Sequence, residues 1–451
     1  MDRNAPRPTS SRYWLTDART PACLLEKVPA GATVEPDGLA RVDIAIADGC
    51  VQAVEKAGAA PSDTATFDQD GGQVWPAYVD VHTHLDKGHI WPRAENPDGS
   101  FMGARLAVVD DRSANWTPED VRRRMDFSLR LAWAHGTRAV RTHIDSLPPQ
   151  HGKSWPVFAA MRDAWAGRIE LQGVSLFPMP LFGERDAARA VADTVADHGG
   201  IFGASAYIDE DAPARMELAF ALAEERGLDL DFHVDEGLDL EARSLRLIAE
   251  TARRRGFKGR INCGHCCSLT VQDEDFIEAT LDIVAETPIS IVSLPMCNIY
   301  LQDRTPGRTP RRRGVTLLHE FRARGIPVSV ASDNTRDPFY GYGDLDMHEV
   351  FTQATRIAQL DRPYGDWPQA VAATPAHVMG LAGVGRIVAG APADLVLYRG
   401  RFYSELLSRP QHDRVVLRAG RAIDATLPDY RELDDLFEER THEPEAARLG
   451  A

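Results

Sequence analysis

Short runs of β-branched and apolar residues recur along the middle of the chain, separated by segments with the apolar spacing of helices. These runs lie near residues 77–82, 138–144, 169–177, 201–207, 229–234, 261–265, 289–295 and 326–332. Strands that alternate with helices in this number predict an α/β fold, a (β/α)₈ barrel of the TIM type. A doubly wound open sheet is the competing fold. The first run is followed by no Gly-rich phosphate fingerprint, which argues against a nucleotide-binding open sheet.

Both ends of the chain have a different pattern, that of short strands and turns. In residues 43–47 the large apolar Ile44 and Ile46 alternate with smaller or polar residues, Asp48-Gly49 is typical of a hairpin turn, and residues 393–398 and 414–417 again indicate strands. We therefore predict one small β-sandwich domain built from both ends. The expected domains are 1–72 and 381–451 for the sandwich and 73–380 for the barrel. We expect the polar first ten residues to form a loose tail, and the Glu-rich residues 431–448 to form an exposed helix or tail.

Charge and composition narrow the choice of partners and compartment. The 451 residues carry a formal net charge of −16, which argues against nucleic acid and acidic membranes as partners, because both require a basic face. The sequence contains neither a signal-peptide pattern nor a run of the ~20 apolar residues that cross a membrane. The six cysteines are irregularly spaced, without a disulfide framework. A cytoplasmic protein is therefore expected.

The strongest chemical signal is a His-x-His pair at the end of the first predicted barrel strand. Residues 78–81 are an apolar strand that leads directly into His82 and His84. In a strand, residues i and i+2 point to the same side, so both imidazoles face one way. At the carboxyl end of a barrel strand that side is the active-site face, and two neutral imidazoles there suit Zn²⁺ or Fe²⁺.

Three later predicted strands also end in side chains that can bind metals. His233 ends one strand with Glu236 three residues beyond it, His265 ends the next, and Asp333 follows the last. A single histidine in an apolar strand is more often a satisfied core residue. Polar residues of this kind at four strand ends are harder to explain by packing, so they predict one shared site.

Taken together, His82-x-His84, His233-x-x-Glu236, His265 and Asp333 resemble the pattern of the amidohydrolase superfamily, and within it the cytosine deaminase group. The resemblance extends over about residues 14–430. Further segments that carry it are Phe177-Pro178, Asn298–Gln302, Arg311-Arg312-Arg313, Asp333–Tyr340 and the run from Gly385 to Leu395.

This resemblance implies a mononuclear site, with one Zn²⁺ or Fe²⁺ bound by His82, His84, His233 and Asp333. The predicted fourth strand, 201–207, has no lysine to bridge a second metal. The implied enzyme is a metal-dependent aminohydrolase that deaminates a small cytosine-like N-heterocycle with an activated water and releases ammonia. Asp333 accepts a proton from that water, Glu236 protonates the ring nitrogen, and His265 polarises the attacking oxygen. Relatives form homo-oligomers, so we expect one here.

The substrate pocket departs from the cytosine deaminase pattern. Phe177-Pro178 is followed by Met179, where such deaminases have a glutamine that reads the amide edge of the pyrimidine. Methionine cannot make that paired contact. Asn334 stands where relatives often have a second aspartate. With Phe177 and Phe339 as aromatic walls, these residues predict a ring with a larger or less polar edge than cytosine.

Two other functions remain open from the sequence. The same site could serve a cyclic amidase or an alkylaminohydrolase acting on a triazine-like ring, or the scaffold could bind a ligand without catalysis. Glu236 argues against a simple binder, because binding needs no proton shuttle.

Four remaining features carry weaker signals. Cys263-x-x-Cys266-Cys267 has no second cysteine pair at zinc-site spacing, so we expect buried or loop thiols. Lys87 is expected in a loop or behind the ligands. His143 could face the substrate or have an ordinary hydrogen-bonded role. The basic run 311–313 is expected to form salt bridges or to order a loop over the substrate.

Overall fold

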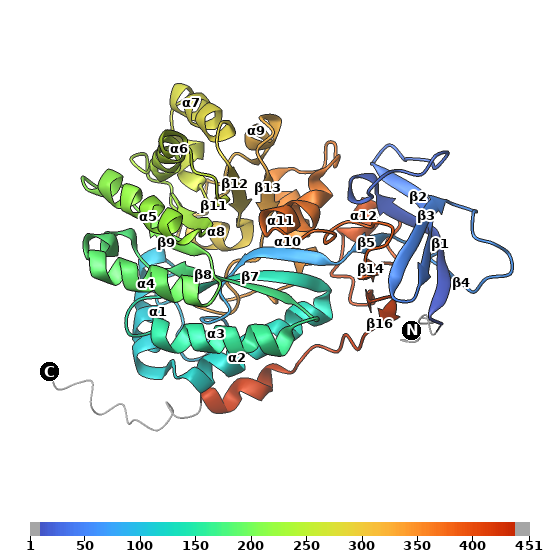
Figure 1. Cartoon of the computed structure of the whole chain (residues 1–451), viewed down its shortest axis with the longest axis horizontal. Helices are drawn as coiled ribbons and strands as arrows, with labels where there is room; N and C mark the ends of the chain where they lie inside the picture. Colours follow the sequence, from blue (N-terminus) through green and yellow to red (C-terminus); the bar gives the residue numbers. More distant parts are fainter. Residues whose placement is uncertain (1–9, 438–451) are drawn as a thin grey trace.

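The computed structural model describes residues 10–437, and two parallel sheets form its centre. The three-stranded sheet has the order β6-β7-β8 and the five-stranded sheet the order β13-β12-β11-β10-β9. Their bounds are β6 Tyr78–Thr83, β7 Thr137–Asp145, β8 Glu170–Leu176, β9 Phe202–Ala206, β10 Leu230–Val234, β11 Ile261–His265, β12 Ile289–Ser293 and β13 Val328–Val330. Parallel bridges link Val174 to Ile201 and Thr83 to Asp333, one at each side. The strands thus follow one another in a closed order, which is consistent with the predicted barrel (Figure 1).

Helices lie outside these strands (Figure 1). Their bounds are α1 Phe101–Asn115, α2 Pro118–His135, α3 His151–Trp165, α4 Arg185–Asp197, α5 Ala212–Arg226, α6 Ser244–Arg255, α7 Glu274–Ala285, α8 Pro295–Leu301, α9 Leu318–Ala323, α10 Met347–Ala358, α11 Ala373–Val378 and α12 Tyr403–Leu406. The ends of α2 follow from its sequence. Thr117 caps its first turn, Pro118 opens it, and Gly136 ends it with φ 98°. A Cβ atom at Gly136 would lie 2.7 Å from Val396, so glycine also permits close packing there.

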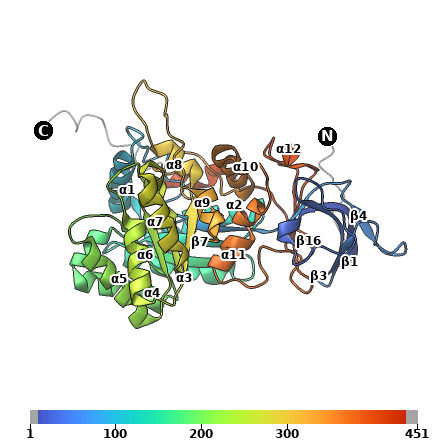
Figure 2. The ribbon, with the colours of Figure 1, turned by 90° about the horizontal axis from the view of Figure 1, so that it is seen from above.

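A second region contains two four-stranded sheets, with the orders β3-β2-β1-β4 and β16-β15-β14-β5. The bounds are β1 Arg12–Pro21, β2 Leu39–Ala47, β3 Cys50–Lys56, β4 Thr66–Asp68, β5 Val74–Pro76, β14 Leu395–Leu397, β15 Val415–Arg418 and β16 Arg421–Ala422. Trp75 pairs with Val396, so strands from both chain ends meet. One hydrophobic cluster includes Leu15 and Ile44 from the first sheet and Leu417 from the second. Figure 2 shows β1, β3 and β4 at one end of the molecule and α4–α7 at the other.

The end of the described chain returns from the β region to α2 (Figure 1). Residues Tyr430–Leu436 form a 3-10 helix in which Leu433 packs on Phe127 and Leu131. The part of the predicted Glu-rich segment up to residue 436 is therefore docked on the parallel-strand region, and residues 438–448 lie outside the described range. Most of the predicted N-terminal tail, residues 1–9, also lies outside it. Among the described helices none is both long and apolar enough to span a membrane.

Candidate metal centre and active site

Four side chains converge at the carboxyl ends of three strands. His82 belongs to β6, His84 follows it directly, His233 belongs to β10, and Asp333 comes shortly after β13. His233 Nε2 lies 3.2 Å from both His82 Nε2 and His84 Nε2. Asp333 Oδ1 lies 3.2 Å from His84 Nε2 and 3.6 Å from His82 Nε2. Such separations suit ligands of a single Zn²⁺, whose bonds to nitrogen and oxygen are about 2.0–2.2 Å long.

The state of these atoms fits a divalent cation. All four side chains are buried, and within residues 10–437 neither carboxylate oxygen of Asp333 has a hydrogen-bond donor. Burial lowers the pKa of His82, His84 and His233 well below the ordinary value, so these imidazoles are neutral, the form that binds metals. A buried carboxylate among neutral rings is costly without a compensating charge. The donor set supplies the nitrogen and oxygen ligands that Zn²⁺ and Fe²⁺ accept.

His143 and His265 border the same spot. Ligand atoms of His82, His143 and His233 form one group close enough to hold a metal, and those of His82, His265 and Asp333 form another. The His143 ring lies 4.0 Å from that of His82, centroid to centroid. Neither of its nitrogens has a hydrogen bond within the described chain, although Nε2 lies 3.8 Å from Asp231 Oδ1, so the ordinary hydrogen-bonded role that we considered is not seen.

Backbone strain is concentrated at these strand ends. Asp235, His265 and Asp333 have φ values of 46°, 70° and 62°, the left-handed region that side chains other than glycine rarely adopt. Each such residue costs about 1–3 kcal/mol unless its surroundings hold it there. The strain therefore coincides with the positions where site residues leave the strands.

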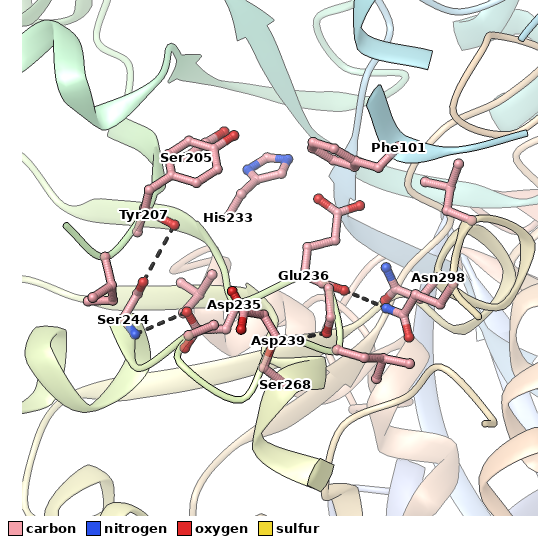
Figure 3. A pocket seen from close by; sticks show the side chains of 18 of the residues that line it. Phe101, Ser205, Tyr207, His233, Asp235, Glu236, Asp239, Ser244, Ser268 and Asn298 are labelled. Atoms are coloured by element: carbon pink, nitrogen blue, oxygen red, sulfur yellow. Dashed lines mark hydrogen bonds between the residues drawn. The ribbon is translucent and has the colours of Figure 1, made fainter. Parts of the chain in front are cut away.

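Glu236, in the loop after β10, reaches into a cavity that His233 also lines. Figure 3 shows its carboxylate pointing towards Phe101, between His233 and Asn298. Burial raises the pKa of Glu236 to about 7, although the charge of Lys87 acts in the opposite direction. Glu236 Oε1 lies 3.8 Å from His265 Nδ1. A carboxyl group with this pKa can both donate and accept protons at neutral pH.

The orientation of His265 is set by Asn298 and Cys267. The thiol of Cys267 donates to Asn298 Oδ1 at 3.3 Å, which turns the amide nitrogen of Asn298 towards His265 Nδ1 at 3.0 Å. His265 Nδ1 is then an acceptor, and the ring carries its proton on Nε2. That Nε2 has no partner among the described residues, so its N–H is available to an oxygen atom in the site.

The cysteines of the Cys263-x-x-Cys266-Cys267 motif are buried. Cys263, Cys266 and Cys267 are buried free thiols, as expected from the sequence. Burial raises their pKa values, which keeps them protonated. The contact of Cys267 with Asn298 was missed from the sequence. It joins the end of β11 to α8 and has no signal in residue spacing.

Two cavities open beside the metal centre. The larger has a volume of about 440 Å³, and its lining includes His233, Glu236 and Asn298 (Figure 3). The smaller has a volume of about 120 Å³, and its lining includes Lys87 and Asp145. Phe101, Ser205 and Tyr207 line both cavities.

The four predicted substrate contacts divide into two pairs. Phe177 and Phe339 line the smaller cavity. Met179 is fully buried in the 3-10 helix Met179–Gly183 and lines neither cavity, because this helix turns it into the hydrophobic core. Asn334 lines neither cavity and donates to Asp337 Oδ2 at 2.8 Å. The structure thus gives no support to a substrate contact by Met179 or Asn334.

Comparisons with known proteins address the family. The Amidohydrolase family model matches residues 117–424. The chain belongs to the amidohydrolase family. A pterin deaminase of Rhizobium rhizogenes is 52% identical over 430 residues, 95% of this chain and 98% of the relative. The predicted class, a hydrolytic deaminase that acts on carbon–nitrogen bonds, is confirmed.

More distant members of the family share the fold or part of the sequence. A 5-methylcytosine deaminase from Klebsiella pneumoniae has a TM-score of 0.78 and 23% identity, covering 92% of this chain and 98% of that structure. An N-isopropylammelide isopropyl amidohydrolase of Pseudomonas sp. is 24% identical, over 73% of this chain and 81% of the relative. This amidohydrolase therefore has the fold of the predicted cytosine deaminase group.

Proposed function

We propose that this amidohydrolase deaminates a pterin, 2-amino-4-oxopteridine. Water adds its oxygen at C2, the C2–N bond to the exocyclic amine breaks, and 2,4-dioxopteridine and ammonia are the products. The observation that carries the proposal is the 52% identity with a pterin deaminase over 95% of the chain. The 440 Å³ cavity beside Glu236 is within the range of small-molecule sites and supports a ring larger than cytosine. The proposal replaces the cytosine-like ring by a bicyclic one that contains the same amino-oxo pyrimidine.

In this proposal His82, His84, His233 and Asp333 hold one Zn²⁺ or Fe²⁺. The ion supplies a bound water whose pKa is lowered to ~7, so that a nucleophile exists at neutral pH. The converging Nε2 atoms of the three histidines and the Asp333 oxygens without a hydrogen-bond donor among the described residues support this assignment.

The remaining steps belong to side chains of the chain itself. Asp333 accepts the proton of the attacking water, since its second oxygen is unpaired within the described residues. Glu236 protonates the ring nitrogen next to C2 and then helps the amine to leave as ammonia. His265 donates its Nε2–H to the attacking oxygen. Phe177 and Phe339 provide aromatic surface for the flat ring.

The architecture that we propose is the (β/α)₈ barrel of residues 73–380 with a β-sandwich from 1–72 and 381–451. The closed strand order supports the barrel, and the hydrophobic cluster shared by the two sheets supports the sandwich. The pairing of β5 with β14 moves residues 74–76 to the sandwich side of the boundary. A homo-oligomer and a cytoplasmic location stay predictions.

A second candidate is the removal of an alkylamine from a triazine-like ring. It is favoured by the 24% identity with the Pseudomonas amidohydrolase. The two functions differ in product, because one releases ammonia and the other an alkylamine.

The test uses the whole protein, freed of metal and reloaded separately with Zn²⁺ and Fe²⁺. Each form is given pterin, cytosine and an isopropylamino-substituted triazine, and ammonia, isopropylamine and the change in ring absorbance are measured. We expect ammonia from pterin at a rate well above that from cytosine, and no turnover by metal-free protein. Isopropylamine release without pterin turnover would establish the second candidate and overturn the first.

A further inference from the structure

The smaller cavity contains a buried cation that the mechanism above does not use. Lys87 follows His84 by three residues, and its side chain is only 6% exposed. Its ammonium lies 5.3 Å from the centre of the Phe339 ring. A lysine this deeply buried needs a reason, since burial of an ammonium is costly unless it is paired.

One side of the Lys87 ammonium is firmly held. Its Nζ lies 3.3 Å from Asp145 Oδ1, and the other oxygen of Asp145 accepts from Arg112 at 2.8 Å. The backbone N–H of Asp145 donates to Asp86 Oδ2 at 2.7 Å. Asp145 is thus held in place by its own strand β7, by Arg112 of α1 and by Asp86 of the loop after β6. Asp145 in turn holds the Lys87 ammonium.

The other side of the ammonium faces the cavity. An ammonium has three N–H donors, and across residues 10–437 Asp145 is the one carboxylate in ion-pair contact with it. Lys87 lines the smaller cavity together with Phe177 and Phe339, whose rings suit a flat heterocycle. Donors therefore remain for a ligand that lies between these rings.

This cavity adjoins the larger cavity, with which it shares three lining residues. Phe101, Ser205 and Tyr207 border both cavities, and Glu236 borders the larger one. Burial raises the pKa of Glu236, and the positive charge of Lys87 opposes this rise, so the ammonium acts on the proton donor. A ring that places its amine-bearing carbon near Glu236 can extend its neighbouring edge towards Lys87.

We propose that Lys87 is a specificity-determining residue that donates a hydrogen bond to the ring carbonyl oxygen, O4 of a pterin. The inference rests on the proposed function and deepens it. In the 2-amino-4-oxo form of a pterin N3 carries a hydrogen, so attack at C2 pushes electron density onto N1 and, through the conjugated ring, onto O4. A fixed ammonium at O4 stabilises the added negative charge. Lys87 keeps its proton throughout, and Asp145 is its positioning residue.

The contact also accounts for the missing glutamine. Met179 is buried in the core and cannot read the ring. An ammonium can only donate hydrogen bonds. It therefore favours a substrate with a ring carbonyl at this position over one with an amino group there. The residue that recognises the carbonyl edge of the ring, Lys87, therefore lies in the loop after β6 and not in the segment after β8.

The test compares two substrates in two enzymes. The wild type and Lys87→Met are assayed for kcat/KM on pterin and on 2-aminopteridine, which lacks the carbonyl oxygen. We expect Lys87→Met to lower kcat/KM on pterin by roughly 10- to 100-fold, the range of a hydrogen bond to a charged group. The factor by which kcat/KM falls on the analogue should be at least tenfold smaller. Lys87→Gln, which keeps an N–H donor without the charge, should recover part of the loss on pterin.

Controls separate this inference from folding and from the proposed function. Lys258→Met removes an exposed lysine before β11 and should change kcat/KM on neither substrate. Metal content and melting temperature of each variant are measured beside the kinetics. Equal losses by Lys87→Met on both substrates would overturn the carbonyl contact. Failure of the wild type to deaminate pterin would instead overturn the proposed function.

Discussion

Two buried clusters of histidine and aspartate in this amidohydrolase differ in whether their polar atoms have partners. At the candidate metal centre, both oxygens of Asp333 and one or both nitrogens of the surrounding histidines lack hydrogen-bond partners in the described structure. The second cluster, His135, Asp344, Asp346 and Arg414, joins the end of α2 to the chain before α10 and to the C-terminal strands. We call it the joint cluster.

The joint cluster is saturated. Arg414 donates to both oxygens of Asp346, at 2.7 and 2.5 Å, and to the carbonyls of Gln411 and Pro410. His135 Nε2 lies 2.9 Å from a carboxylate oxygen of Asp344. Its polar groups therefore satisfy one another without any further ligand.

The two clusters shift the pKa of their aspartates in opposite directions. Burial raises the pKa of Asp333 well above its ordinary value, and Glu236 adds to this. The charge of Arg414 lowers the pKa of Asp346 despite its burial. A buried carboxylate without a protein partner thus marks a place for a ligand, and a fully paired one marks a structural joint.

The largest effect is expected at the metal centre, from Glu236→Gln. The amide has the size of the acid but cannot deliver a proton, so kcat should fall by about 10²- to 10⁴-fold. Metal content should remain, because Glu236 is not among the converging ligands. Ammonia release and atomic absorption measure the two quantities.

Glu241→Gln is the matched control, since Glu241 lines the same cavity but is exposed to solvent. It should change kcat by less than about threefold, the scale of a surface substitution. Loss of metal from Glu236→Gln would show that this carboxylate belongs to the ligand set, and our division of roles would be wrong.

Substitutions in the joint cluster should lower the stability of the protein and leave its catalytic activity unchanged. Asp346→Ala leaves Arg414 buried without its main partner and should lower the free energy of unfolding by about 3–5 kcal/mol. The activity of the folded fraction should not change. Denaturant titrations with parallel assays measure this.

The pH dependence of this stability follows from the lowered pKa of Asp346. The wild type keeps the contribution above the ordinary pKa of aspartate and loses it as pH falls towards the folded value. Asp346→Ala should therefore lose less stability in acid than the wild type. Asp413→Ala, which breaks an exposed pair with Arg399, is the control and should cost at most about 1 kcal/mol. An equal loss in both variants would contradict the distinction between buried and exposed pairs.

The parts of the site that could be predicted from the sequence are those set by strand periodicity. His82 and His84 share a side because side chains alternate along β6, and His233 and Asp333 join them because parallel strands end at one edge. Such relations need only local structure and a closed strand order. The strands, the β region built from both chain ends and the converging positions of the candidate ligands could therefore be predicted.

The remaining features depend on directions that residue spacing does not encode. Met179 directly follows Phe177-Pro178 in sequence, yet a 3-10 helix turns it into the core. Lys87 gains its position from Asp145 on β7 and Arg112 on α1, which no spacing rule connects. Pocket residues are therefore harder to predict than metal ligands, because loops and not strands orient them.

Met179 offers a sharper test of that limit. Met179→Gln places an amide in a packed apolar site without a partner, so it should lower the free energy of unfolding by about 1–3 kcal/mol. It should not create cytosine deaminase activity. Thermal unfolding and ammonia release from cytosine measure both. Met102→Gln, on a half-exposed methionine of α1, is the control and should be nearly neutral. A gain of cytosine turnover by Met179→Gln would return this residue to the pocket.

The smallest expected effect is a displacement of the pH profile. Glu236 acts as an acid with a pKa near 7, so the alkaline limb of kcat/KM should fall about tenfold per unit above that pH. The charge of Lys87 holds this pKa down, whereas burial alone would set it higher. Lys87→Met should therefore move the alkaline limb to higher pH, measured with 2-aminopteridine so that the carbonyl contact does not enter. Lys258→Met should leave the limb in place. If the alkaline limb stays in place in Lys87→Met, the fall in activity reports the titration of a group other than Glu236. The unpaired state of the polar atoms at the candidate metal centre would then have no bearing on this pH profile.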